Sequence, residues 1–270
     1  MPDLEFRVII DPDLDRQIDG VVAFGDFDAS DHSSVIYRED ETHLFCRDLI
    51  LGRHYPMTLV MRSLGSLGSL VSCAIYLHRD LAIHPSVPGL LASVSLVDNY
   101  GIVGLAHTDP DLSRFFKLCR VFLSSAPGEH VKQDRLTTAV GWIRDIILDG
   151  QYPALPPDPD PPRILDHGSD GFVLASSSHP DLMSGWENLY RRGYLRGLLI
   201  YGAQDMWHCL AARKSHFLAF DLAKAAQILN AAEQAMGEDP AWTQDGLWLS
   251  SPPSGTLILP SDLLRVFLRV

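Results

Sequence analysis

A proline-rich segment near the middle of the chain places the strongest limit on its fold. Residues 151–162 read QYPALPPDPDPP. Proline has no backbone N–H and its ring obstructs a helix interior, so this run can form neither a helix nor a central strand. We interpret it as a semi-rigid, polyproline-like linker. The sequence therefore predicts an N-terminal domain over residues 1–150 and a C-terminal domain over residues 163–270.

The composition is that of an ordinary folded protein. The 270 residues suit one large domain or two modest ones, and 46% hydrophobic residues with 21% charged residues are enough for a real core. The net charge of −12 argues against a broad nucleic-acid-binding surface, because such a surface needs a basic footprint. A small phosphorylated substrate, held locally by metal ions, is compatible with that charge.

The sequence shows no sign of export or membrane insertion. It lacks the basic start and apolar run of a signal peptide, and no stretch approaches the ~20 apolar residues of a membrane span. The four cysteines form no CxxC pair, so we expect reduced and mostly buried thiols. We therefore expect a cytoplasmic protein with no membrane partner.

Hydrophobic periodicity predicts an α/β fold in both halves. In the N-terminal part we expect a mostly parallel sheet, with strands at 5–10, 20–25, 33–38 and 43–46 and helices at 67–77, 88–97, 110–123 and 133–148. The smaller C-terminal part is expected to be α/β or α+β. Its predicted strands are 171–175, 197–201, 207–212, 247–249 and 256–259, and its predicted helices are 181–192, 222–236 and a last one from 261.

The first of two aspartate clusters follows the strand predicted at 5–10. Asp11, Asp13 and Asp15 alternate along the chain, so in an extended segment their side chains would share one face. Carboxylates at strand ends repel one another, and a divalent cation can hold them together. The pattern predicts a metal-binding edge. The alternative is a solvated acidic turn, which Asp-Pro-Asp also forms.

The second cluster follows the strand predicted at 20–25 and is chemically richer. It contains Asp26, Asp28, Asp31 and His32. Mixed carboxylate and imidazole ligands suit Mn²⁺, Mg²⁺ or Fe²⁺ better than structural zinc, and two such ions would clamp a phosphoryl group and activate a water. The alternative is a polar loop in which His32 only hydrogen-bonds to a neighbour.

Other candidate residues lie outside these clusters. Asp98 ends a long apolar stretch, so we expect either a partly buried carboxylate that needs a cation or several hydrogen bonds, or a simple helix-ending turn. Arg213 and Lys214 follow a predicted strand and would meet a phosphate or form an exposed basic turn. We interpret residues 166–168 as a turn, and residues 179–181 as a helix N-terminus capped by Ser178 or Asp181.

Taken together, these pieces resemble the DHH/DHHA1 phosphoesterase superfamily. The segment from Asp11 to Asp15 has the spacing of the family's His-x-Asp-x-Asp motif, and Asp31-His32-Ser33 is similar to the Asp-His-His motif. The resemblance implies two α/β domains with an active site in the cleft between them. It also implies that His32 and Asp98 are metal ligands, and that residues 211–215, which read AARKS, match the strand that carries a substrate-binding basic residue.

The chain departs from the family at three places. Asp11 stands where the family has a histidine, Ser33 stands where the second histidine would contact phosphate, and the glycine-rich GGGH loop is missing. These departures favour a rival hypothesis, a non-catalytic ligand- or partner-binding protein on a degenerate hydrolase scaffold. A third hypothesis is an enzyme of another class whose aspartates are structural.

The preferred prediction is a metal-dependent hydrolase that acts on a phosphoester, such as that of a small nucleotide. Asp28, Asp31 and His32 are the candidate catalytic residues, and Arg213 and Lys214 are the candidate substrate-binding residues. Mn²⁺ or Mg²⁺ is the expected cofactor, and its predicted ligands are Asp11, Asp13, Asp26, Asp28, His32 and Asp98. The apolar tail at 263–270 is expected to dock on its own domain, with a homodimer interface as the alternative.

Overall fold

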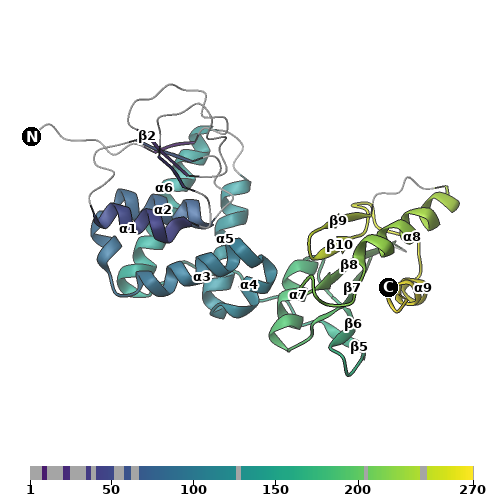
Figure 1. The fold of residues 1–270 in the computed structure, drawn as a ribbon. Coiled ribbons are helices and arrows are strands. Elements are labelled where there is room, and N and C mark those ends of the chain that lie inside the picture. Colours follow the sequence, from purple (N-terminus) through teal and green to yellow (C-terminus); the bar gives the residue numbers. More distant parts are fainter. Residues whose placement is uncertain are drawn as a thin grey trace, which may run out of the picture. The chain divides into compact units, whose positions relative to one another are not determined.

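The chain forms two compact units, Met1–Pro157 and Asp158–Val270, each with its own hydrophobic core (Figure 1). The computed structural model describes residues 8–10, 21–24, 35–37, 41–51, 58–61, 67–125, 129–203, 206–237 and 242–269. The division falls inside the proline-rich segment, and residues 151–162 form neither helix nor strand. None of the helices in the described ranges is long and apolar enough to cross a membrane.

The first unit carries a four-stranded parallel sheet. Its strands are β1 (Val8–Ile10), β2 (Val21–Phe24), β3 (Val35–Tyr37) and β4 (Thr58–Met61). Their spatial order is β1-β4-β2-β3, and each neighbouring pair runs parallel. β4 therefore lies between β1 and β2, although it is the last of these four strands along the chain.

The strand predicted at 43–46 is wrong, because these residues belong to helix α1 (Thr42–Ile50). The buried positions of α1 include Phe45, Cys46 and Leu49, which are spaced as on one face of a helix. A short apolar run does not distinguish a strand from a helix segment, and β-branched residues are absent from 43–46. The strand of this region is instead β4, which the sequence prediction missed.

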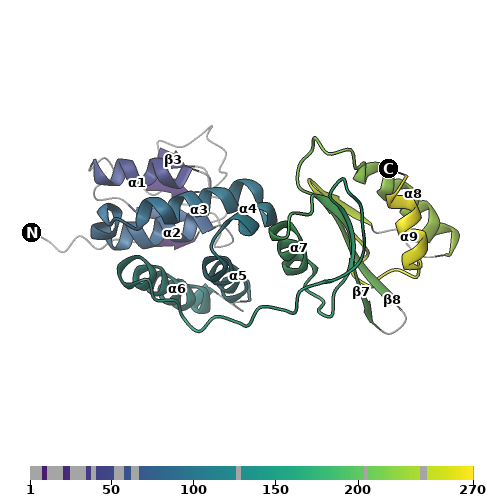
Figure 2. The same ribbon diagram turned by 90° about the horizontal axis from the view of Figure 1, so that it is seen from below.

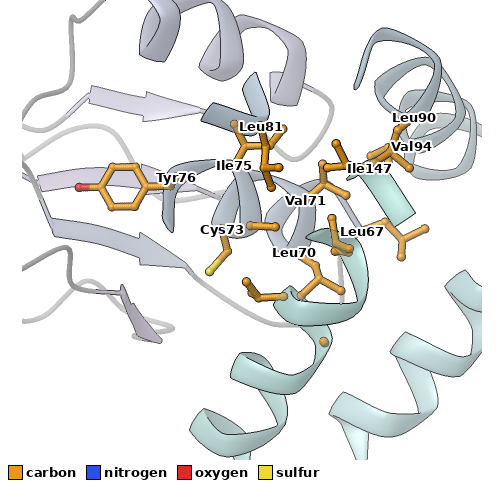
Figure 3. Packing of buried hydrophobic residues seen from close by; sticks show 14 of the residues in the cluster. Leu67, Leu70, Val71, Cys73, Ile75, Tyr76, Leu81, Leu90, Val94 and Ile147 are labelled. Atoms are coloured by element: carbon orange, nitrogen blue, oxygen red, sulfur yellow. The ribbon is translucent and has the colours of Figure 1, made fainter. Parts of the chain in front are cut away.

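Helices of the first unit pack around α2 (Leu67–Leu77), which is mostly apolar and is buried from Leu67 to Tyr76. A helix that is buried on every side has to be enclosed by other elements. Figure 2 shows α2 among the other helices of this unit, and Figure 3 shows its side chains with Leu81, Leu90, Val94 and Ile147. The helices that pack on α2 are α1, η2 (Arg79–Ile83), α3 (Val87–Tyr100) and α6 (Glu129–Asp149). α4 (Ile102–His107) packs on α3, and α5 (Pro110–Ser124) packs on α4 and α6.

The second unit is a six-stranded mixed sheet with strand order β5-β6-β7-β8-β10-β9. β6 and β7 pair parallel, and the other neighbours pair antiparallel. The α/β class is confirmed, but the pairing in this unit is mostly antiparallel. The strands are β5 (Arg163–His167), β6 (Phe172–Ser176), β7 (Arg196–Ala203), β8 (Met206–Arg213), β9 (Thr243–Asp245) and β10 (Trp248–Ser250).

Helices cover both faces of this sheet (Figure 2). Helix α7 (Leu182–Arg191) lies on one face, and α8 (Leu222–Ala235) and α9 (Pro260–Phe267) lie on the other. Phe172 and Leu174 of β6 join the core under α8 and α9, and the alternate residues Val173 and Ala175 point to the opposite face. Because both faces are covered, β6 is buried from Phe172 to Ala175.

Two sequence predictions in this unit are wrong. The turn predicted at 166–168 begins in strand β5, whose side chains are mostly exposed, so it has no apolar pattern to mark it. The strand predicted at 256–259 is only an isolated bridge between Trp207 and Thr256. The predicted start of α7 is confirmed, because the Asp181 carboxylate accepts a hydrogen bond from the Ser184 N–H at 3.1 Å.

Candidate functional site

The parallel sheet of the first unit brings the carboxyl ends of its strands to one edge. Ile10 of β1 and Phe24 of β2 both pair with Met61 of β4, and Phe24 also pairs with Tyr37 of β3. The four strand ends are therefore in register. In parallel α/β sheets ligands bind outside this edge, because loops and helix N-termini gather there.

Both acidic segments of the sequence continue directly from these strand ends. Asp11 is the residue after Ile10, and Asp26 comes two residues after Phe24. Only β4 separates the two strands that lead into them. The predicted side chains themselves lie outside the described residues: Asp11, Asp13, Asp15, Asp26, Asp28, Asp31 and His32.

Asp98 is the predicted metal ligand that the structure describes. It is half-buried in the last turn of α3, which continues to Tyr100. Its Oδ2 accepts a hydrogen bond from the backbone N–H of Gly68 at 2.9 Å. Gly68 lies in the first turn of α2, where N–H groups lack partners within the helix and the helix dipole favours a negative charge.

This contact gives Asp98 a structural role, because it stabilises the start of the helix that follows β4. Met61 ends β4 and Leu67 begins α2, so strand and helix are consecutive elements. In such a β-loop-α unit the helix starts at the edge where the strand ends. Asp98 is thus tied to the same edge that the two acidic segments leave, and its metal-binding role stays a prediction.

The sequence analysis missed Asp48, a buried carboxylate next to this sheet. Asp48 lies on α1 and accepts hydrogen bonds from Tyr37 Oη at 2.7 Å and from Arg47 Nε at 3.1 Å. Tyr37 is the last residue of β3, so Asp48 joins α1 to the end of that strand. Asp48 was missed because a strand was predicted at 43–46. Only the spacing of a helix puts Asp48 on the same buried face as Phe45.

Arg213 and Lys214, the predicted substrate-binding residues, lie in the second unit. Arg213 ends β8; its Nη1 donates to the Phe220 carbonyl oxygen at 2.9 Å, and its Nη2 lies 3.4 Å from His216 Nδ1. The Lys214 N–H donates to the Leu195 carbonyl oxygen at 2.7 Å. The Arg213 guanidinium therefore holds the loop after β8 in place, and phosphate binding by either residue stays a prediction.

Within the described ranges, no three His, Cys, Asp or Glu side chains come together so as to hold a metal ion. This finding concerns Asp98 but none of the other predicted ligands, which lie outside those ranges. Of the two acidic segments, the structure shows only that the strands before them, β1 and β2, are separated by β4 alone.

Comparison with known proteins adds no relative. No protein-family model, no curated protein and no solved structure matches this chain.

Proposed function

We propose that the chain is a metal-dependent hydrolase of phosphoesters, with small nucleotides as the substrate class. Its metal site would lie at the carboxyl edge of the parallel sheet in the first unit. The observation that supports this most is the register of Ile10 and Phe24 on Met61. Two strand spacings, roughly 10 Å, separate the strands that lead into the two acidic segments.

The residue types of these segments suit a hard divalent cation. Carboxylates with one imidazole are ligands for Mn²⁺ or Mg²⁺. A bound ion would lower the pKa of a water molecule that attacks phosphorus at neutral pH. Asp28, Asp31 and His32 would orient that water and the ester, and Arg213 or Lys214 would neutralise the phosphate. The proposed ligands are Asp11, Asp13, Asp26, Asp28, His32 and Asp98.

The rival function is a binding protein that does not turn its ligand over. The hydrogen bond from the Gly68 N–H to Asp98 favours this rival, because the Asp98 carboxylate already has a structural role at the start of α2. Replacement of the family's second histidine by Ser33 favours it as well. Metal binding and turnover therefore have to be measured separately.

Calorimetric titration of the full chain with Mn²⁺ tests the metal site. We expect saturable binding that Asp28→Ala and His32→Ala each weaken at least about tenfold, which is ~1.4 kcal/mol. Absence of Mn²⁺ binding in the wild-type protein, or affinity unchanged in both variants, would rule the site out. Turnover of generic phosphodiesters and nucleotides with Mn²⁺ then separates the hydrolase from the binding protein.

Asp98→Asn separates a ligand from a helix cap. Asparagine retains a carbonyl oxygen for the Gly68 N–H but removes the charge, so we expect weaker Mn²⁺ binding with little change in melting temperature. The matched control is Asp109→Asn, since Asp109 caps α5 by accepting from the N–H groups of Asp111 and Leu112 at 2.9 and 3.2 Å. Equal Mn²⁺ affinity in the two variants would leave Asp98 a structural residue.

A further inference from the structure

The second unit has a pocket of about 330 Å³ at the start of α7. Helix α7 begins at Leu182 and leaves part of its face of the sheet uncovered. On that part, Tyr201 of β7 and His208 of β8 are cross-strand partners, and Ser250 of β10 lies on the next strand. The volume falls within the range of small-molecule sites, which starts near ~300 Å³.

The far rim of the pocket is a rigid turn, Ser251-Pro252-Pro253. The Cys209 N–H donates to Ser251 Oγ at 3.0 Å, and the Ser251 N–H donates to the Cys209 carbonyl oxygen at 3.0 Å. The Gly255 N–H donates to the Pro252 carbonyl oxygen at 2.8 Å, which closes the turn. Because these bonds and the two prolines fix the rim, a ligand need not order it on binding.

The lining side chains favour a positive ligand. The rings of Tyr201 and His208 have centroids 6.1 Å apart and planes inclined by 35°. An aromatic ring face carries negative potential and attracts cations. Asp181 adds a carboxylate and Met183 a polarisable thioether, whereas the lining described by the structure contains no lysine or arginine.

The N-terminus of α7 opposes this preference, because the helix dipole favours an anion there. Asp181 offsets the helix terminus directly, since its Oδ1 accepts from the Ser184 N–H at 3.1 Å. The dipole is equivalent to about half a unit charge, and the carboxylate carries a whole one. The negative charge of Asp181 therefore outweighs the partial positive charge of the helix terminus.

We propose that this pocket binds a small organic cation, a protonated or quaternary amine. The charged group would lie over the Tyr201 and His208 rings and against the Asp181 carboxylate. This site belongs to the second unit and does not depend on the metal site proposed for the first. It would give the protein a second ligand of opposite charge to a phosphoester.

Choline and its neutral carbon isostere, 3,3-dimethylbutan-1-ol, test the role of charge. Both are titrated into the full chain, with the methyl resonance of Met183 followed by NMR. We expect saturable binding of choline and binding of the isostere at least about fivefold weaker, as a cation–π contact predicts. Equal affinity for the two molecules, or no saturable binding of choline, overturns the proposal.

Two variants locate the site. Asp181→Asn removes the charge but keeps an N-cap of similar quality, so α7 should stay folded while choline affinity falls about three- to tenfold. Tyr201→Leu removes the ring face and should weaken choline binding similarly, whereas Tyr201→Phe should not. Choline affinity unchanged in both Asp181→Asn and Tyr201→Leu contradicts the proposed location.

Asp221→Asn is the matched control for Asp181→Asn. Asp221 caps α8 by accepting from the Lys224 N–H at 3.0 Å, and it does not line the pocket. We expect choline affinity equal to that of the wild type; a loss as large as in Asp181→Asn overturns the proposal. A trimethyllysine peptide, compared with its norleucine analogue, distinguishes a peptide side chain from a free amine as the source of the cation.

Discussion

The four cysteines show how burial sets the chemistry of single residues. All four are free in the structure and buried, and their burial was expected from the sequence. Loss of hydration penalises the thiolate, and burial raises the pKa of Cys46, Cys73 and Cys119 to about 12. Burial raises the pKa of Cys209 as well, and the charge of Glu233 adds to that effect.

We expect the native thiols to react slowly with a disulfide reagent such as DTNB. The thiolate is the nucleophile, and a thiol with a pKa of about 12 is almost entirely protonated at pH 8. Absorbance during the reaction should show a rate at least about 100-fold below that of the urea-denatured chain. Rapid reaction of all four thiols in the folded protein would contradict the burial.

The same pKa shifts predict a loss of stability in alkali. The folded thiol holds its proton up to about pH 12, whereas the ordinary pKa is 9.0, so the folded state binds more protons between these values. The contribution of the buried thiols to the free energy of unfolding is fully present below pH 9, and it is lost as the pH rises toward 12. Cys46→Ala should flatten the decline in melting temperature between pH 8 and 11. An equally steep decline in that variant would assign the effect to other groups.

Glu233 is a buried residue that no local pattern indicated. It lies on α8, only 2% exposed, and accepts hydrogen bonds from Thr256 Oγ1 and from Trp242 Nε1, the latter at 3.2 Å. These bonds join α8 to segments that follow it in the chain. The helical pattern at 222–236 predicted the helix correctly. The pattern does not show that Glu233 is buried, because its partners Trp242 and Thr256 lie outside the helix.

At the scale of elements, the contact between α3 and α4 depends on Gly104 of α4. Gly101, with φ 54°, ends α3, and α4 follows at once. A Cβ at Gly104 would lie 2.0 Å from the Leu96 carbonyl oxygen and 2.8 Å from the Val97 Cα. The α4 backbone therefore lies directly against that of α3, and no side chain fits between them.

Gly104→Ala is expected to destabilise the first unit by about 2–3 kcal/mol, because the backbones have to separate. The matched control is Gly141→Ala in α6, where no atom lies within 4 Å of an added Cβ. That change should stabilise the helix by about 0.5–1 kcal/mol. Urea unfolding followed by circular dichroism measures both, and effects of the same sign would contradict the contact at Gly104.

At the scale of the whole molecule, the proline-rich segment is shared between the two units. Tyr152 packs on Phe115 of the first unit, with ring centroids 6.0 Å apart. Arg192 of the second unit donates from Nη1 to the Pro162 carbonyl oxygen at 3.2 Å. The start of the segment thus belongs to the first core and its end to the second, which places the division near residue 157.

Fragments 1–157 and 158–270 are therefore each expected to fold. Each keeps one hydrophobic core intact, and each is long enough to bury a stable one. Thermal unfolding by circular dichroism should show a cooperative transition for both. A fragment from 182 to 270, which lacks β5 and β6, serves as the control and should not fold. Failure of either whole-unit fragment would show that the cores depend on each other.

Sequence reasoning worked best where structure depends on neighbouring residues. The helices at 67–77, 110–123 and 222–236 are present nearly as predicted, since their apolar spacing and caps are local. It failed where an element has no distinctive local pattern. The exposed strand β5 and the short strand β4 form because partners elsewhere in the chain pair with them.

The candidate site divides in the same way. The sequence by itself determined that acidic residues follow β1 and β2, and that the proline-rich segment forms neither helix nor strand. It also determined that the cysteines lack the spacing of a paired motif. Only the tertiary structure decided that β4 lies between β1 and β2, that Asp98 meets Gly68, and that α7 leaves a pocket over Tyr201 and His208. The physical reason is that backbone and capping preferences act over a few residues, whereas strand order and burial come from contacts between residues far apart in the chain.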